Sequence, residues 1–167
     1  MATNRMSSLL SKIERLPAPL RTRARSALIG RMVRFVGTAG LSIEELTHSR
    51  AVVFVRNRKA VQNHIGTIHA AVMALIAETA SGFVVGMNVP DDRVPVIKSM
   101  RVDFVKRASG SLRAVAELTP EQIAAITSTD KGEVAPRLVV TDEEGNQPVV
   151  CEMLWAWRPK RRSPGNG

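Results

Sequence analysis

Residues 68–87 read IHAAVMALIAETASGFVVGM, and this stretch decides the fold. Nearly every position is apolar, so a helix formed here is apolar on every side and must be covered by other parts of the protein. His69 and Glu78 lie inside the stretch and Arg93 follows soon after it, which is not typical of a membrane-spanning helix. We therefore predict one long helix at the centre of a globular core.

Length and composition allow one such core. The chain has 167 residues, of which 44% are hydrophobic, with 11 Gly, 9 Pro and one Cys. These values exclude a large multidomain enzyme, a collagen-like chain and a chain disordered throughout. Cys151 is single and lies in an apolar run, so an intrachain disulfide and a cysteine-rich metal site are excluded. We expect a small core residue at Cys151, no metal, and a reducing, cytoplasmic compartment.

Apolar and polar residues alternate on both sides of the central helix. Residues 41–43 and 53–55 predict two short strands before it. After it, residues 96–105 and 111–118 predict a hairpin that turns at residues 108–110. One face of the second strand of this hairpin carries Leu112, Ala114, Ala116 and Leu118.

The last third of the chain predicts one short helix and a second hairpin. Residues 119–122, Thr-Pro-Glu-Gln, combine a hydroxyl N-cap, a proline at the first helical position and a glutamine three residues after the cap. We predict that this helix ends near Thr127. Residues 133–140 and 149–157 predict a final hairpin around the turn residues 143–146.

Two strands, one buried helix and four further antiparallel strands suggest a single architecture. A strongly curved antiparallel sheet wrapped around the helix covers it within one short chain. We therefore predict an α+β, hotdog fold for residues 41–158. Because one sheet leaves a face of the helix uncovered, we expect a homodimer or a dimer of dimers.

The net charge of +9 is concentrated at the two ends of the chain. Residues 1–40 have eight basic residues and one acidic residue, and residues 158–167 have four basic residues and none acidic, whereas residues 41–157 have twelve basic and fourteen acidic residues. The central part is therefore not basic. It also lacks the interleaved aromatic residues of a nucleic-acid surface, since the chain has no Tyr, four Phe and two Trp. We expect no nucleic-acid partner.

Residues 1–40 predict a basic helical extension, with helices over 7–16 and 20–36 that are separated by prolines. The second helix carries an apolar stripe at Leu20, Ala24, Ala27, Leu28, Met32 and Phe35, and off this stripe lie Arg21, Arg25 and Arg34. We favour a helix that caps the domain with solvated arginines over weak contact with a membrane surface, and a transit peptide is the remaining alternative. Residues 159–167 predict a disordered basic tail.

Glu78 is the first candidate for chemistry, because it is the only formally charged residue between Lys59 and Asp91. A carboxylate in an apolar helix has a raised pKa unless it is paired. It is therefore either a buried hydrogen-bond or ion-pair partner, or a general base or nucleophile. Both interpretations stay open at this point.

His69 and Glu78 are nine residues apart, so they face opposite sides of a helix and are separated by roughly 13 Å along it. A site that uses both must combine two subunits. Asn63 and Gly66 lie just before the helix N-terminus, where free amides and the helix dipole favour negative charge on a substrate oxygen. The sequence therefore predicts an oxyanion hole there.

The spacing of these residues resembles a known family. The segments that carry the resemblance are Asn63, His69-Ala70-Ala71 and Glu78-Thr79-Ala80. They are similar to the phenylacetyl-CoA type of hotdog acyl-CoA thioesterase, and the whole chain looks most like an uncharacterised thioesterase branch of that superfamily. The resemblance implies hydrolysis of an acyl-CoA or acyl-carrier thioester, with coenzyme A entering as part of the substrate and with no further cofactor.

The resemblance also implies a role for each residue. Glu78 would activate water or attack the thioester carbonyl, and Asn63 would position the water or the thioester. His69 would orient the thioester, and the Ala70 amide would donate to the oxyanion. Further substrate contacts are expected at His64, Gly66 and Ala71, and coenzyme A phosphate contacts at Lys98, Arg101, Lys106 and Arg107.

Two other functions are compatible with the same residues. In hotdog dehydratases a histidine precedes the helix glutamate by fourteen residues, and His64 has this spacing from Glu78. A non-catalytic protein that binds acyl groups or lipids is the second alternative.

Overall fold

The computed structural model describes residues 4–160, which form five α-helices and seven strands. The helices are α1 (Arg5–Ile13), α2 (Ala18–Met32), α3 (Arg34–Ala39), α4 (Ala70–Gly86) and α5 (Pro120–Ser128), with a short 3₁₀ helix at Lys59–Val61. The strands are β1 (Ser42–Leu46), β2 (Arg50–Val55), β3 (Arg93–Phe104), β4 (Leu112–Glu117), β5 (Gly132–Val134), β6 (Arg137–Asp142) and β7 (Val149–Pro159).

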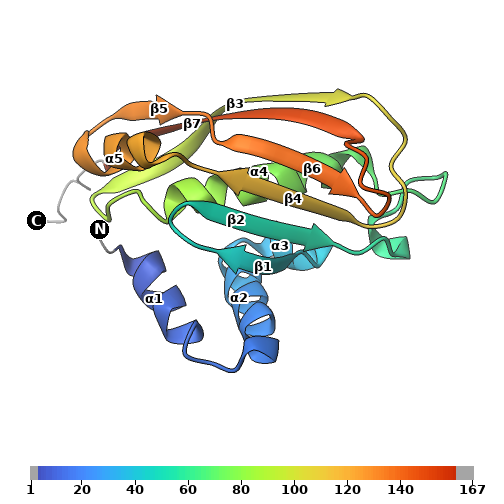
Figure 1. Cartoon of the computed structure of the whole chain (residues 1–167), viewed down its shortest axis with the longest axis horizontal. Coiled ribbons are helices and arrows are strands. Elements are labelled where there is room, and N and C mark those ends of the chain that lie inside the picture. Colours follow the sequence, from blue (N-terminus) through green and yellow to red (C-terminus); the bar gives the residue numbers. More distant parts are fainter. Residues whose placement is uncertain (1–3, 161–167) are drawn as a thin grey trace, which may run out of the picture.

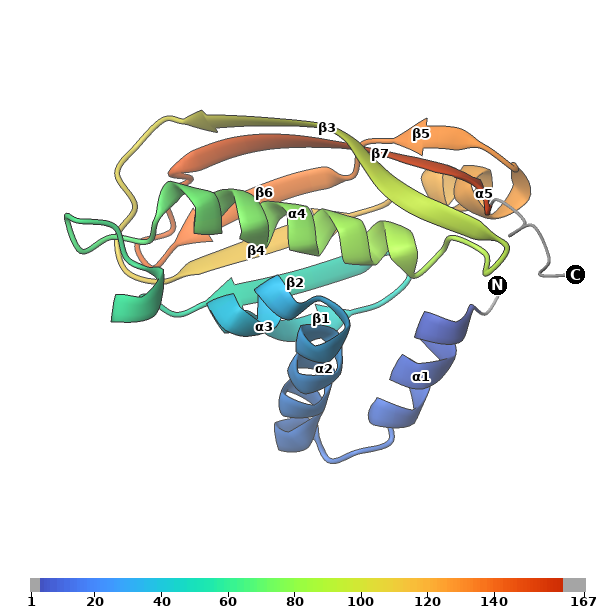
Figure 2. The same ribbon diagram turned by 180° about the vertical axis from the view of Figure 1, so that it is seen from behind.

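The strands curve around α4, as the hotdog prediction requires. One sheet has the strand order β1-β2-β4-β6 and the other has the order β3-β7-β5, and every pairing is antiparallel. Figure 1 shows the strands in front of α4, and the view from behind in Figure 2 shows α4 lying along their concave side. Helices α2 and α3 lie beside β1, and α1 lies next to α2, below the C-terminal end of α4 (Figure 2).

The long central helix is confirmed, and so is its one uncovered face. The side of α4 that contacts the sheets is fully buried at Ile76, Ala77, Ala80 and Val84. The opposite side is exposed at Ala71 and half-buried at Ala74, Leu75, Glu78 and Gly82. These positions recur every three to four residues, so they form one stripe along the helix.

The inner face of β3 is uncovered beside this stripe. Met100 and Phe104 pair with Met153 and Val149 of β7, which are buried, and directly paired residues share one face of a sheet. Met100 and Phe104 are nevertheless 54% and 55% exposed. Core-facing surface of α4 and β3 is therefore left open in a single chain.

The first predicted hairpin is wrong in its pairing, although both of its strands exist. β3 pairs with β7 along eleven residues, and β4 lies between β2 and β6. Strand length explains the difference, because β3 and β7 have 12 and 11 residues whereas β4 has six. The predicted common face of β4 is confirmed, since Leu112, Ala114, Ala116 and Leu118 are all buried.

The predicted strand over residues 133–140 is two strands, so five strands follow α4 instead of four. Pro136 lies between β5 and β6, and it has no N–H for a strand ladder. β5 pairs with β7 and β6 pairs with β4, so the final hairpin does not form as a pair. The predicted turn at residues 143–146 is present and is closed by the Asp142 N–H to Asn146 oxygen bond of 2.9 Å.

The short helix after Thr119 is confirmed with its cap. Thr119 accepts a hydrogen bond from the Gln122 backbone N–H at 3.3 Å, and the Gln122 side chain accepts one from the Thr119 N–H at 2.9 Å. The helix ends at Ser128, one residue beyond the predicted end. This capping box identifies the start of α5 from sequence alone.

The predicted apolar stripe of the second helix is wrong. Leu20, Met32 and Phe35 are 46%, 53% and 58% exposed, whereas Arg25 is only 7% exposed. The helix also ends at Met32, and α3 begins after the extended residue Val33. The buried side of α2 carries Arg25 as well as the core residue Ile29, and it packs on β1, an edge strand whose open polar groups need partners.

Arg25 and Ser26 provide those partners. An Arg25 guanidinium N–H donates to the Glu44 carbonyl, and the Ile43 N–H donates to Ser26 Oγ at 2.9 Å. Arg25 also pairs with Glu14 at 3.1 Å, which ties the end of α1 to α2. The N-terminal extension is therefore joined to the sheet through polar contacts that hydrophobic patterning does not detect.

Replacing Ser26 with Ala should lower the free energy of unfolding by about 1–2 kcal/mol, because the buried Ile43 N–H loses its acceptor. The measurement is urea unfolding of the two proteins. Ser8→Ala removes an exposed helical serine and is the matched control. Equal effects of the two substitutions would contradict the role of Ser26 as the acceptor for the Ile43 N–H.

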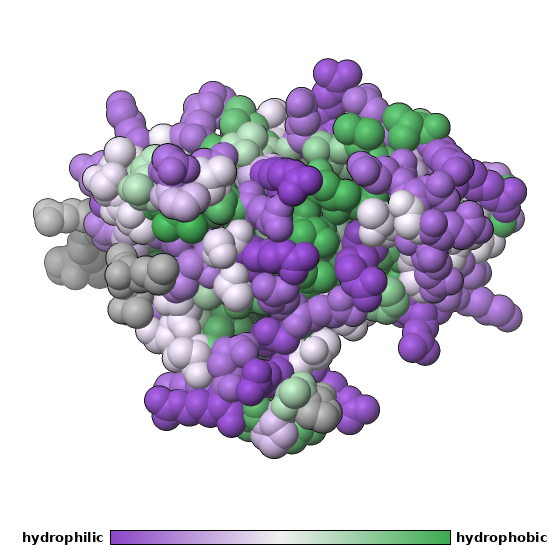
Figure 3. All heavy atoms as spheres, in the orientation of Figure 1, coloured by the Kyte–Doolittle hydropathy of each residue, from purple (hydrophilic) through white to green (hydrophobic). Residues whose placement is uncertain are grey.

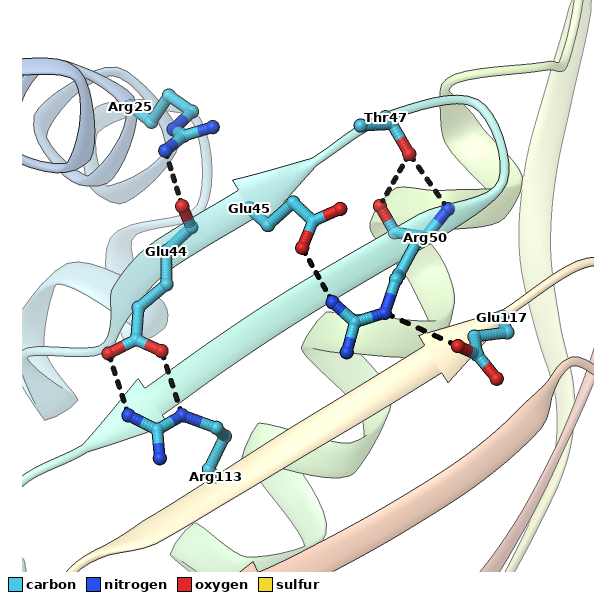
Figure 4. A network of polar contacts seen from close by, with 7 residues as sticks. All are labelled: Arg25, Glu44, Glu45, Thr47, Arg50, Arg113 and Glu117. Carbon is cyan, nitrogen blue, oxygen red and sulfur yellow. Dashed lines mark hydrogen bonds and ion pairs between the residues drawn. The ribbon is translucent and has the colours of Figure 1, made fainter. Parts of the chain in front are cut away.

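The outer face of the sheet carries opposite charges in pairs. Arg113 holds Glu44 through two bonds of 2.8 and 3.1 Å, and Arg50 contacts Glu45 at 2.6 Å and Glu117 at 3.3 Å (Figure 4). Hydrophilic residues cover most of this face in Figure 3. The basic residues here are neutralised locally, so this face does not form a continuous anion-binding surface.

Three smaller predictions concern Cys151, the tail and the membrane. Cys151 is buried in β7, and burial raises the pKa of its thiol to about 11, so it is an unreactive core residue as predicted. The disordered tail predicted for residues 159–167 is wrong at its start, because Pro159 is the last residue of β7 and the Lys160 backbone N–H donates to the Asp92 carbonyl at 2.8 Å. The rest of the predicted tail, residues 161–167, lies outside the described residues. Among residues 4–160 no helix is both long and apolar enough to cross a bilayer.

Candidate active site along helix α4

Glu78 lies in the middle of α4 and lines an apolar cavity of about 450 Å³. Burial raises the pKa of its carboxyl group above the ordinary value. The neighbouring Thr79 hydroxyl opposes this shift, although Thr79 Oγ1 is buried without a hydrogen bond of good geometry. The sequence-based expectation of a raised pKa at Glu78 is confirmed in direction.

No cation stabilises the Glu78 carboxylate within the described part of the chain. Burial is the leading cause of its pKa shift, and no charged neighbour contributes to that shift. An ion-pair role for Glu78 is therefore not found within a single chain. A desolvated carboxylate of this kind is a stronger base than an exposed one, which suits proton abstraction from water.

The N-terminus of α4 presents a histidine and an open backbone amide. His69 is the N-cap, and its Nδ1 accepts a hydrogen bond from the Ala71 N–H at 3.0 Å. An accepting Nδ1 places the ring proton on Nε2, so the exposed side of this ring is a donor. The Val72 and Met73 N–H groups donate to the His69 carbonyl, and within residues 4–160 the Ala70 N–H has no acceptor. The amide predicted for an oxyanion is thus open.

Asn63 shapes the turn before α4. Its Oδ1 accepts from the Ile65 and Thr67 N–H groups at 3.0 and 3.2 Å, and its Nδ2 donates to Thr67 Oγ1 at 2.8 Å. Gly66 adopts a φ of 79° in this turn, a value that favours glycine. The amide of Asn63 is therefore engaged within its own turn, and His64 lies exposed in the same turn.

The structure brings two of the predicted substrate-contact residues together. Gly66 and Arg107 both line a polar cavity of about 330 Å³ next to the turn before α4. Lys106 lies nearby but donates to Asn146 Oδ1 at 2.7 Å, and Lys98 forms an ion pair with Glu133 of β5. Of the four basic residues predicted to meet phosphates, Arg107 alone lines this cavity.

The structure does not bring His69 and Glu78 together in one chain. Both lie on α4, nine residues apart, and this corresponds to roughly 13 Å along the axis and to opposite sides of it. The amide end of α4 (Asn63, His69 and Ala70) and Glu78 are therefore two half-sites. Each half is open to solvent, and neither half alone combines a base with an oxyanion donor.

Sequence reasoning missed the residues that form the walls of the Glu78 cavity. Trp155 of β7 packs against Gly82, whose Cβ, if present, would come within 2.6 Å of the indole ring. The Trp155 Nε1–H donates to Ser81 Oγ at 3.0 Å, which fixes the ring against α4. A glycine in the middle of an apolar helix is the one available signal for such a close approach.

Within residues 4–160 no three His, Cys, Asp or Glu side chains gather to hold a metal ion.

A curved antiparallel sheet around one long helix, with a carboxylate at the middle of that helix, defines a hotdog protein of the superfamily that includes thioesterases. Within it the chain belongs to the family described as Domain of unknown function (DUF4442), whose model matches residues 21–157. No curated protein matches the sequence significantly.

Solved structures agree with this fold. A Pseudomonas aeruginosa protein of unknown function, described as a probable thioesterase, is 26% identical, with 87% of this chain and 97% of that chain covered and a TM-score of 0.73. A Haemophilus influenzae thioesterase is 13% identical, with coverages of 78% and 87% and a TM-score of 0.64. A Staphylococcus aureus thioesterase is 16% identical, with coverages of 76% and 100% and a TM-score of 0.64.

Proposed function

We propose that this protein hydrolyses an acyl-CoA or acyl-carrier thioester with Glu78 as the catalytic base. The observation that carries the proposal is a carboxylate without a cationic partner, half-buried in an apolar cavity at the centre of a hotdog helix. The Pseudomonas aeruginosa neighbour, described as a probable thioesterase, supports the same reaction class. A single buried cysteine is consistent with the cytoplasmic compartment in which we place the protein.

The chemistry follows from the two half-sites. Glu78 accepts a proton from water, and the hydroxide attacks the thioester carbonyl carbon. The carbonyl oxygen becomes an oxyanion, which the open Ala70 N–H and His69 Nε2–H stabilise by donating to it. When the carbon–sulfur bond breaks, Glu78 returns the proton to the leaving thiolate, and the products are a carboxylic acid and a free thiol.

We propose a homodimer because the two half-sites need one another. A second copy that covers the open stripe of α4 and the inner face of β3 would bury Met100 and Phe104. In such a dimer the amide end of α4 from one protomer lies beside Glu78 of its partner. Arg107, at the polar cavity next to the same helix end, is then placed to meet a phosphate of coenzyme A.

The test is the release of free thiol from acetyl-CoA, octanoyl-CoA, palmitoyl-CoA and phenylacetyl-CoA. Hydrolysis of at least one of them well above the rate in buffer supports the proposal. Turnover of none of them, with retained binding of acyl ligands, would favour a non-catalytic binding protein. Conversion of a 3-hydroxyacyl thioester to an enoyl product that depends on His64 would favour a dehydratase instead.

A further inference from the structure

The cavity at Glu78 is built jointly by the hotdog domain and the N-terminal helices. Its floor is the second half of α4, including Thr79, Phe83 and Gly86. One wall comes from α1 and from the junction of α2 and α3, and the other comes from the start of β3 and from Trp155. The cavity therefore runs along α4 from Glu78 to Gly86, roughly 12 Å.

The α1 wall is fixed in place by specific hydrogen bonds. The Asn4 side chain is 5% exposed, and its Nδ2 donates to the carbonyls of Gly86 and Val89, each at 2.7 Å. The Arg5 N–H donates to both carboxylate oxygens of Asp91 at 3.1 Å. These bonds hold the start of α1 at the end of the cavity remote from Glu78, so the cavity is formed before any ligand enters.

Two glycines of α4 allow the walls to close on the helix. The Trp155 ring occupies the space that a side chain at Gly82 would need. At Gly86 a Cβ would lie 3.0 Å from the Met6 methyl group of α1. Since these two positions share the face of α4 that carries Glu78, the carboxylate is the one charged group on an otherwise bare helical surface.

The side chains that line the cavity indicate what it holds. Apart from Thr79 next to Glu78, the lining between the two ends of the cavity is mostly apolar. The charged residues Arg5, Asp91, Arg93 and Lys160 belong to the end remote from Glu78. A volume of about 450 Å³ lies in the range of small-molecule sites. An elongated apolar slot with a carboxylate at one end and polar groups at the other suits an extended hydrocarbon chain.

We propose that this cavity holds the acyl chain of the substrate, and that α1 and the α2–α3 junction set its preferred length. The proposal rests on thioester hydrolysis at Glu78, because the thioester carbonyl must lie at the Glu78 end of the slot. The N-terminal extension then acts as a specificity wall. Substrates with a short acyl group leave the slot empty and gain nothing from it, and each added methylene raises kcat/KM by about fourfold until the slot is full.

Two substitutions on opposite walls test the specificity wall. Leu9→Phe on α1 and Val33→Phe between α2 and α3 reduce the space in the slot, since both residues line it. Their combination should lower kcat/KM for octanoyl-CoA at least tenfold and leave acetyl-CoA within twofold. Leu20→Phe is the matched control, because Leu20 is 46% exposed, as Leu9 is, but does not line the cavity.

Ligand binding gives a readout that does not depend on hydrolysis. Trp155 lines the cavity and Trp157 does not, so ω-bromododecanoate bound in the slot should quench the fluorescence of Trp155. Quenching should be lost in Trp155→Phe and weakened at least tenfold in the double phenylalanine variant, with no change in Leu20→Phe. This design leaves both native tryptophans in the pocket-filling variants.

The outcomes separate the acyl slot from the proposed reaction. Quenching by bromododecanoate without any thiol release would overturn the hydrolysis proposal and retain the slot as a binding site. Thiol release whose chain-length profile is the same in the double variant and in the wild type would overturn the slot and retain hydrolysis. If saturating bromododecanoate did not quench the fluorescence of Trp155, the acyl-slot proposal would also be wrong.

Discussion

Replacing Glu78 with Gln lowers kcat/KM for thioester hydrolysis by at least ~10²-fold, because the amide cannot accept the proton of the attacking water. The substitution keeps the size and polarity of the side chain, so the cavity is preserved. Burial raises the pKa of Glu78, and the deprotonated form is the active one. The activity of the wild type therefore falls on acidification at a higher pH than an exposed glutamate would give.

The same substitution should stabilise the protein at neutral pH. A carboxyl group whose pKa is higher in the folded state than in the unfolded state favours unfolding once the pH rises above the unfolded-state pKa. That penalty grows until the pH passes the folded-state pKa. Thermal unfolding at several pH values should show no gain for Glu78→Gln under strongly acidic conditions and a higher Tm for the variant near neutrality.

Glu152→Gln is the matched control for both measurements. Glu152 is exposed on the outer side of β7 and lies outside the cavity. Its replacement should change neither kcat/KM nor the pH dependence of Tm. If Glu78→Gln retained full activity, or if it lost activity together with stability at neutral pH, Glu78 would be a structural residue and the proposed mechanism would be wrong.

The sequence predicts the parts of this fold in which local chemistry and burial agree. The helix over residues 68–87 is apolar on all sides, and the Thr119 capping box needs only four adjacent residues. Pairing between strands is different, because it depends on lengths and on partners far away in the chain. The partner of β3 lies more than fifty residues further along the chain, since Met100 pairs with Met153 and Arg101 pairs with Glu152, so the predicted pairing with the adjacent β4 is wrong.

The candidate site also has residues that the sequence reveals and residues that it does not. Glu78 and His69 are detectable because a charged and a titratable group stand out in an apolar helix. The N-terminal wall is not detectable, because the buried side of α2 combines Ile29 with Arg25 and Ser26, which contact backbone groups of an edge strand. Periodicity assigns Leu20, Met32 and Phe35 to the core, yet they are exposed. The cavity residues of α1 depend on Asn4, whose partners follow more than eighty residues later.

Two inactive variants should restore activity when they are mixed, because the two half-sites come from different subunits. Glu78→Gln removes the base and His69→Asn removes the Nε2–H donor, while asparagine remains a favoured N-cap for α4. Loss of one oxyanion donor alone should cost roughly 10²-fold in kcat. In an equimolar mixture that has exchanged subunits, half of the dimers are mixed, and each mixed dimer carries one intact site.

The expected activity of that mixture is about one quarter of the wild-type value, whereas each variant alone stays near its own low rate. The reason is geometric, since nine helical residues separate His69 from Glu78 and a single chain cannot join them. A site within one chain would leave every mixed dimer without an intact set, so the mixture would show no recovery. Combining both substitutions in one chain and mixing it with wild type is the control, because it separates subunit exchange from complementation. After complete exchange that mixture should keep about one quarter of the wild-type activity, because a mixed dimer of wild type and double variant has no intact site. A value of about one half would mean either that the subunits had not exchanged or that the base and the donor come from the same subunit.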